Sequence, residues 1–304
     1  MRAPTLPPAA GKLCAVAPKF DVESLGPGGR YAVERVAEIT GVDSSSRVLE
    51  LGAGHGIASI HLAETRQCRV VATDIDMDKL ERLQMRALAL RLEGLVDVGP
   101  LDCTKAFPHS SESFDLVMAG SVLDRTDVMH VPIAEAFRVL RPGGHVAIYG
   151  ASWKRELDHR DGGVTRVLGK EVRSLADYEI LLTEAGFRIA ASRMLPDHLW
   201  SEYYRQFVDA LEQEQIVEDA LDVPQPWGWY EEAAVVLTHL DVIGVGLVVG
   251  RKDPPAVEPE PLVATEALPL DVAAEVAAEL ELIEAEMQTA AGDVRSVTAL
   301  PEHP

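Results

Sequence analysis

The segment VLELGAGHG, residues 48–56, constrains the fold of this chain more than any other. Apolar positions ending at Glu50 are typical of the end of a buried strand, and a helical pattern follows over residues 57–67. Between them, Gly52, Gly54 and Gly56 let the backbone turn tightly and approach a ligand where a Cβ atom would collide. A strand, a glycine turn and a helix in that order predict a nucleotide-type cofactor site at the carboxyl end of a parallel strand.

Strands and helices alternate along most of the chain. Apolar runs predict strands at 46–51, 68–75, 95–103, 114–122, 145–152, 187–194 and 241–252, with amphipathic helices between them. Uniformly apolar strands separated by helices indicate a parallel sheet covered on both faces. We therefore predict an α/β, Rossmann-like, doubly wound, mostly parallel seven-stranded sheet with one antiparallel strand, the last, plus lid or insertion helices. The RPGG segment, residues 141–144, is predicted to be a turn before the fifth strand.

Composition divides the chain into three parts. Residues 1–20 are rich in Pro and Ala and predict a flexible segment, residues 21–252 form the main domain with an insertion at about 196–238, and residues 253–304 predict an acidic Pro/Ala-rich linker and a helical tail. The net charge is −21, and residues 253–304 hold twelve acidic residues against one basic residue. An acidic protein repels phosphate backbones, so no nucleic-acid partner is expected. The tail helix is either a solvated helix or a contact with another chain.

The cysteines and the apolar runs bear on the compartment. Cys14, Cys68 and Cys103 are too few and too scattered for a disulfide framework or a zinc site, so no metal is expected. No apolar run approaches the roughly 20 residues that a membrane span requires, and the first residues lack the apolar stretch of a secretory signal. We expect a cytoplasmic protein with no membrane partner.

The glycine turn fails as a dinucleotide fingerprint. The pattern G-x-G-x-x-G requires a third glycine where this chain has Ile57 or Ser59, and Glu50 would repel a pyrophosphate. A nicotinamide oxidoreductase is therefore disfavoured, and a ligand with a positive ammonium group suits Glu50 better. Asp74 ends the second predicted strand, 24 residues after Glu50 and directly after an apolar run.

Taken in order, these signals resemble the class I S-adenosylmethionine-dependent methyltransferases over about residues 25–252. ELGAGHG looks like the first motif of that family, TDID like the end of its second strand, LDC like its adenine-edge site and FDLVMAGSVL like the segment beside the methionine moiety. The resemblance implies that S-adenosyl-L-methionine is the cofactor. It implies that these residues hold it: Glu50, Gly52, Ala53, Gly54, Gly56, Asp74, Ile75, Asp102, Cys103, Ala119 and Ser121.

Candidates for the acceptor side come from segments after the fourth, fifth and sixth predicted strands. His198 is the candidate general base, needed only if the nucleophile arrives protonated. His55 is expected to face the cofactor and His61 to lie on the surface. The candidate substrate residues are Trp153, Asp124, Arg125, Trp200, Tyr203, Tyr204 and Trp227. The alternative for these aromatic residues is that they pack a lid helix or anchor an insertion.

Within the family, the chain resembles the small-molecule branch, which includes ubiquinone/menaquinone-biosynthesis and sarcosine/dimethylglycine methyltransferases. MAGSVL stands where enzymes that methylate nucleobase or glutamine nitrogens usually carry Asn/Asp-Pro-Pro-Tyr. The resemblance implies methyl transfer to N, O or C of a small-molecule metabolite, in specialised biosynthesis. The alternative is a non-catalytic methyltransferase-like binding module that acts through its acidic tail.

Overall fold

The computed structural model describes residues 28–123, 128–154, 172–199, 201, 205 and 237–254. Helices and strands alternate through the first half of this part, as the sequence predicts. The elements are α2 Gly29–Thr40, β1 Arg47–Leu51, α3 Ile57–Arg66, β2 Arg69–Asp74, α4 Met77–Ala89, β3 Val96–Pro100, β4 Phe114–Gly120, α5 His130–Val139, β5 Leu140–Trp153, β6 Arg173–Ser174, α7 Leu175–Glu184, β7 Arg188–Met194 and β8 Ile243–Arg251.

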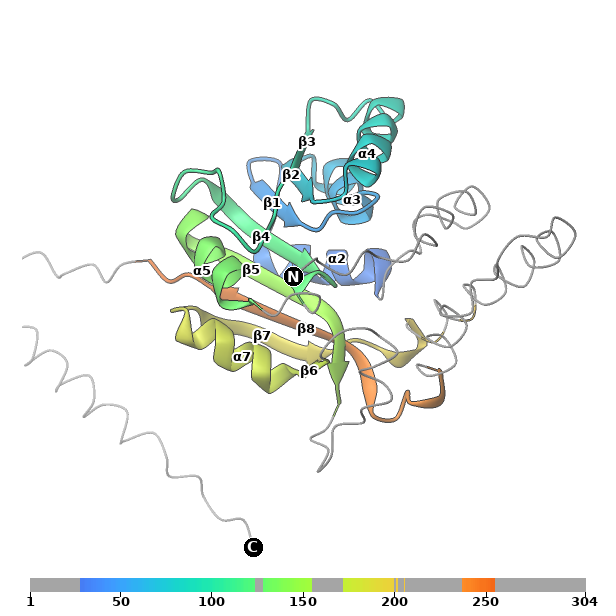
Figure 1. The fold of residues 1–304 in the computed structure, drawn as a ribbon, viewed down its shortest axis with the longest axis vertical. Helices are drawn as coiled ribbons and strands as arrows, with labels where there is room; N and C mark the ends of the chain where they lie inside the picture. The colour runs from blue at the N-terminus through green and yellow to red at the C-terminus, as the bar shows by residue number, and fades with distance from the viewer. Residues whose placement is uncertain are drawn as a thin grey trace, which may run out of the picture. The chain divides into compact units, whose positions relative to one another are not determined.

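One mixed sheet organises these elements, in the strand order β3-β2-β1-β4-β5-β8-β7 (Figure 1). The strands from β3 to β5 pair in parallel, and β8 pairs antiparallel with both β5 and β7. The short β6 pairs with the end of β5, outside the main path. The predicted Rossmann-like sheet with an antiparallel last strand is therefore confirmed.

Helices cover both faces of the sheet, because the parallel strands are apolar on both sides. Figure 1 shows α2, α3 and α4 on one side of the sheet and α5 and α7 on the other. Successive side chains of β1 alternate between the faces: Val48 packs with residues of α2 and α3, whereas Leu49 packs with residues of α5 and α7. This alternation turns Glu50, two residues after Val48, toward α3.

The predicted turn at RPGG is wrong. Residues 141–144 belong to β5, which begins at Leu140 directly after α5. The register against β4 shifts there, from Phe114 opposite Leu140 to Leu116 opposite His145, so the extra residues form a bulge. Gly143 has φ 86°, and a Cβ on Gly144 would come within 2.9 Å of the Arg141 carbonyl oxygen. Gly143 and Gly144 therefore allow the irregular backbone conformation inside β5.

Several predicted segments lie outside the described residues. These are the N-terminal segment 1–20, most of the insertion at about 196–238, and the linker and tail after Pro254. Contacts between Cα atoms divide the chain into residues 1–254 and 255–304. The predicted domain boundaries stay predictions. No helix in the described part is both long and apolar enough to cross a membrane.

Candidate functional site

The glycine turn joins β1 to α3 at the carboxyl edge of the sheet, and its glycines have different physical roles. Gly52 and Gly56 adopt φ values of 68° and 82°, and a Cβ there would come within 2.6 Å of Val122 and 2.5 Å of Leu83. Gly54 adopts φ 55°, but a Cβ there would meet nothing within 4 Å. The backbone is thus packed against the protein on two sides and open at Gly54, which is where a ligand can approach it.

Glu50 is buried on the α3 side of the sheet, with 5% of its surface exposed. The Ser59 hydroxyl on the first turn of α3 donates to Glu50 Oε2, and Thr73 Oγ1 donates to the Glu50 carbonyl oxygen at 2.7 Å. Burial raises the pKa of the Glu50 carboxyl to about 7, against the lowering effect of Ser59, and the nearby Asp74 charge raises it further. A cation beside Glu50 would stabilise its ionised form.

Asp74, the last residue of β2, ties the glycine turn to the next connection. Its Oδ2 accepts a hydrogen bond from the Gly54 backbone N–H at 2.9 Å, and its Oδ1 accepts one from the Asp76 N–H at 3.0 Å. Asp76 in turn caps α4 by accepting from the N–H groups of Asp78 and Lys79. Each Asp74 oxygen keeps a further lone pair, so the carboxylate can still accept two hydroxyl donors.

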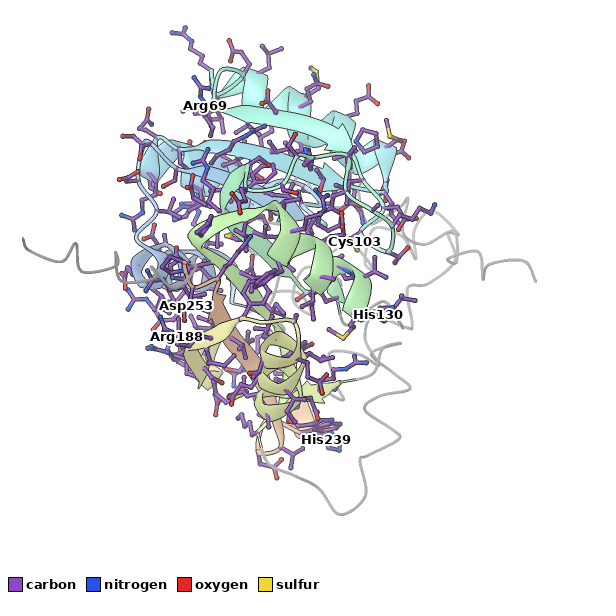
Figure 2. All side chains as sticks on the ribbon, turned by 90° about the vertical axis from the view of Figure 1, so that its left-hand side faces the viewer. Arg69, Cys103, His130, Arg188, His239 and Asp253 are labelled. Atoms are coloured by element: carbon purple, nitrogen blue, oxygen red, sulfur yellow. The ribbon has the colours of Figure 1, made fainter. Side chains whose placement is uncertain are left out.

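The predicted adenine-edge residues follow β2 and β3. Ile75 is 74% exposed, beside Asp74. Asp102 accepts from the backbone N–H and the hydroxyl of Thr104 and pairs with Lys105 Nζ at 2.9 Å, and these contacts, led by the Thr104 hydroxyl, lower its pKa to about 2. Cys103 is half-buried on the same edge (Figure 2). Asp102 thus stays ionised, and a ligand could donate only to the lone pairs that Thr104 and Lys105 do not use.

The end of β4 brings two further predicted residues to this edge. Ala119 is 1% exposed and packs in the core on the α5–α7 side. Ser121 has φ 51°, which is rare for a residue with a side chain, and its hydroxyl is buried with no hydrogen-bond partner in the described part of the chain. The next residue, Val122, packs against Gly52 of the glycine turn. A strained residue with an unpaired buried hydroxyl at this strand end indicates a polar group of a ligand.

Two residues of this site were missed by sequence reasoning. Ser59 was read only as the residue that fails the dinucleotide pattern, yet it is the partner of Glu50. Tyr149 lies opposite Gly120 in the β4–β5 register, and a Cβ on Gly120 would come within 2.5 Å of the tyrosine ring. Burial raises the pKa of Tyr149 and the Glu50 charge raises it further, so the phenol stays protonated beside Glu50. The Gly120–Tyr149 pair has no local sequence signal, because it depends on strand register.

The histidine predictions have mixed outcomes. His61 is not on the surface: it is 8% exposed, and its Nε2 lies 2.6 Å from Glu34 Oε1 on α2. His55, in the glycine turn, is half-buried, and burial and the charges of Lys79 and Arg82 lower its pKa. His198 is exposed in a short helical turn after β7.

The remaining acceptor-side candidates are mostly outside the described residues. Trp153 is the last residue of β5 and is 4% exposed, with an indole N–H that has no partner in the described part. The others are Asp124, Arg125, Trp200, Tyr203, Tyr204 and Trp227, whose positions are not described. The described geometry therefore brings the cofactor candidates together and leaves the acceptor candidates as predictions.

The assembled edge fits an adenosine-type ligand with an ammonium group. It offers a buried carboxylate, an open backbone turn, a second carboxylate with free lone pairs and an unpaired hydroxyl. These come from the ends of β1, β2 and β4, which are neighbours in the sheet. S-Adenosylmethionine has groups that complement the two carboxylates and the hydroxyl: an ammonium, ribose hydroxyls and a methionine carboxylate.

Comparison with known proteins agrees with this geometry. The methyltransferase domain family matches residues 49–148. A 27-O-demethylrifamycin SV methyltransferase from Amycolatopsis mediterranei is 31% identical over 159 residues, which are 50% of this chain and 58% of that protein. The methyltransferase GfsG from Streptomyces halstedii is 28% identical over 176 residues, 54% of this chain and 61% of that protein. The chain thus matches little more than half the length of these relatives.

The fold has solved counterparts. The crystal structure of the [4+2]-cyclase SpnF superposes with a TM-score of 0.67 over 81% of this chain and 93% of that one, at 20% identity. That likeness supports the Rossmann-like fold of the described sheet. Residues 49–148 of this chain match the methyltransferase domain family.

Proposed function

We propose that the chain transfers a methyl group from S-adenosyl-L-methionine to N, O or C of a small-molecule metabolite in specialised biosynthesis. The observation that carries the proposal is the arrangement of Glu50, the open turn at Gly54, Asp74 and Ser121 on one edge of the sheet. The methyltransferase names of the two relatives from natural-product pathways support it.

Each group of the cofactor has a proposed partner of complementary charge or polarity. Glu50, which is hydrogen-bonded to Ser59, would accept hydrogen bonds from the ammonium group. Asp74 would accept hydrogen bonds from the ribose hydroxyls and retain the one from the Gly54 N–H. Ile75 offers an apolar surface for the adenine, and the Ser121 hydroxyl a partner for the methionine carboxylate. When bound, the cofactor supplies a methyl group on a sulfonium. The protein then has chiefly to align the acceptor and exclude water.

The acceptor side is the less determined half of the proposal. The candidates are His198 as a base and the aromatic and charged residues after β4, β5 and β7: Trp153, Asp124, Arg125, Trp200, Tyr203, Tyr204 and Trp227. The base is required only for an acceptor that must lose a proton, such as a hydroxyl. The cytoplasmic setting stays part of the proposal, on the scarcity of cysteines. The alternative of a non-catalytic module is not favoured, because both relatives are named as methyltransferases.

The test is a methylation screen with the full chain. Isotope-labelled S-adenosylmethionine is mixed with pools of amines, hydroxylated polyketides and amino acids, and labelled products are identified by mass spectrometry. We expect label in a small molecule, absent with Gly54→Val. Cofactor binding without transfer to any pool, or transfer that survives Gly54→Val, would count against the proposal.

A further inference from the structure

Lys154 joins three strand ends at the carboxyl edge. It follows the last residue of β5, and its side chain is 17% exposed. Its ammonium lies 2.7 Å from Asp197 Oδ1, after β7, and donates to the Leu240 carbonyl oxygen, before β8. Its backbone N–H donates to the Val242 carbonyl oxygen at 2.9 Å. One residue therefore links the ends of β5 and β7 with the start of β8.

The aliphatic part of the Lys154 side chain lies beside Gly244, near the start of β8. A Cβ on Gly244 would come within 2.8 Å of both Lys154 Cε and Met194 Cε. Gly244 is not among the glycines with positive φ, so a side chain there would act by displacing the flexible ends of Lys154 and Met194 and not by straining the backbone. The stem thus crosses the start of β8 at a residue that has no side chain to block it.

Burial makes the two partners of the ammonium interdependent. A largely buried ammonium is costly unless its protons are donated to acceptors. Asp197 is itself 59% exposed, so a simple surface ion pair would be weak, and the Leu240 carbonyl supplies a second acceptor on another segment. The lysine is therefore stable only when the residue 197 segment and the residue 240 segment are correctly spaced.

This cluster lies on the edge that holds the cofactor candidates, beyond β4 and β5 in the strand order. In Figure 2, His239 lies on the same side of the molecule as Cys103 and His130, whereas Arg188 and Asp253 lie on the opposite side. Asp197 directly precedes His198, the candidate base, and Lys154 directly follows Trp153. Any movement of this cluster would therefore shift both acceptor-side candidates.

We propose that Lys154 is a positioning residue for the acceptor side, which holds the ends of β5, β7 and β8 at the spacing that acceptor binding requires. The inference rests on the proposed function, because that function places the acceptor at this part of the edge. The hydrogen-bond and ion-pair partners of Lys154 among the described residues are Asp197, Leu240 and Val242, none of which is a cofactor candidate. Its effect reaches the acceptor through Trp153 and the turn that carries His198.

The first test measures hydrogen–deuterium exchange and S-adenosylhomocysteine binding in the full chain. Lys154→Met should speed exchange at the amides of residues 195–199 and 239–243 by about tenfold, and leave affinity for S-adenosylhomocysteine within about twofold. Lys154→Arg, which can reach both acceptors, should restore slow exchange. Gly244→Ala, which displaces the stem but keeps the charge, should fall between them. Unchanged exchange in Lys154→Met would overturn the proposal.

The second test uses the first acceptor that the methylation screen identifies. Lys154→Met should raise KM for the acceptor by about tenfold while kcat and KM for S-adenosylmethionine stay within about twofold. Lys154→Arg should recover most of the loss. A uniform fall in kcat, or an arginine variant no better than methionine, would contradict a positioning role. If the wild-type chain binds no S-adenosylhomocysteine, the proposed function fails, and the exchange measurement still decides whether Lys154 links the strand ends.

Discussion

Both edges of the parallel sheet hold paired carboxylates, such as Asp115 and Asp102, but the carboxyl edge also holds Glu50, a buried carboxylate with no ion pair among the described residues. At the amino edge, Asp115 accepts from the Arg47 N–H at 2.7 Å and pairs with Arg141 at 2.9 Å, and Asp43 accepts from Ser45 and Ser46. Hydrogen bonds, led by that of the Ser45 hydroxyl, lower the pKa of Asp43. At the carboxyl edge, Glu50 is buried with a raised pKa and the Ser121 hydroxyl has no partner among the described residues.

The presence of a cavity does not by itself distinguish the carboxyl edge from the amino edge. The amino edge has a cavity of about 620 Å³, lined by Ser44, Ser45, Ser46, Arg47, Arg69, Val71, Asp97 and Arg141. Figure 2 shows Arg69 there, on the opposite side of the sheet from Cys103. Asp115 forms an ion pair with Arg141, which lines this cavity. The comparison teaches that an unpaired buried hydroxyl and an uncompensated carboxylate locate the binding edge better than a hollow does.

The largest expected effect comes from Gly54→Val. A side chain there fills the open face of the turn and is strained at φ 55°, so affinity for S-adenosylhomocysteine should fall at least about 100-fold by calorimetry. Gly41→Val is the matched control, because Gly41 has φ 70° and equally open surroundings but lies before β1. Both variants should lose about 1–2 kcal/mol of stability, and only the first should lose binding. Equal binding by the two variants would remove Gly54 from the site.

Glu50→Gln should separate binding from stability. Because the folded-state pKa of about 7 exceeds the ordinary glutamate pKa of 4.5, the native protein holds this proton more tightly than the unfolded chain. Wild-type stability therefore falls as pH rises from 4.5 to 7 and stays reduced above 7. The glutamine variant should be more stable by up to about 3 kcal/mol at pH 8 and no more stable near pH 4, as measured by urea unfolding. Its affinity for S-adenosylhomocysteine should fall.

Asp43→Asn, at the amino edge, should change the stability at pH 8 in the opposite direction to Glu50→Gln. The pKa of Asp43 is lowered, so its stabilisation is present above its unfolded-state pKa and is lost as the pH falls through the folded-state value. This variant should lose stability at pH 8, keep it near pH 3 and bind the cofactor normally. A stability gain at pH 8 in Asp43→Asn, or none in Glu50→Gln, would erase the contrast between the edges.

Asp74→Asn should weaken cofactor binding by about 10- to 100-fold, the range expected when one charge-assisted hydrogen-bond acceptor is lost. Asp115→Asn is its counterpart at the amino edge, where the lost carboxylate bonds Arg47 and Arg141. Calorimetry should show a normal affinity for Asp115→Asn. Comparable losses of affinity in both variants would mean that the effect of Asp74 is only structural.

The smallest effect is expected at the pair of Arg188 and Asp253, which join β7 to the residues after β8. The guanidinium Nε lies 3.0 Å from Asp253 Oδ2, and both side chains are about half exposed. Asp253→Asn should lower the stability only slightly in urea unfolding, and less still at high salt, because water and ions screen an exposed pair. A larger loss that salt does not reduce would show that this exposed pair is not an ordinary surface ion pair.

The features that sequence predicts correctly are local. The β1–turn–α3 unit and the position of Asp74 at the end of β2 follow from short apolar runs and from glycine spacing. The antiparallel last strand also follows from the sequence pattern, because a strand that comes after a long helix can insert antiparallel beside its neighbour. The positions of the cofactor candidates at the strand ends can thus be predicted from the sequence, and their binding roles stay predictions.

The features that sequence misses depend on partners far along the chain. His61 was placed on the surface because its partner, Glu34, lies 27 residues earlier on another helix. RPGG was read as a turn because its bulge exists only against β4. Ser59 and Tyr149 gain their roles only when α3 and β5 pack beside Glu50. Most of the acceptor candidates lie outside the described residues, so their proposed roles stay predictions.

The central claim is that the carboxyl edge binds S-adenosylmethionine, and calorimetry on the full chain tests it most directly. S-adenosylhomocysteine and NADH are titrated separately at pH 7.5. The account predicts micromolar binding of S-adenosylhomocysteine that is lost in Gly54→Val and kept in Gly41→Val, with no binding of NADH. Binding of NADH, or S-adenosylhomocysteine affinity that is undiminished in Gly54→Val, would contradict it.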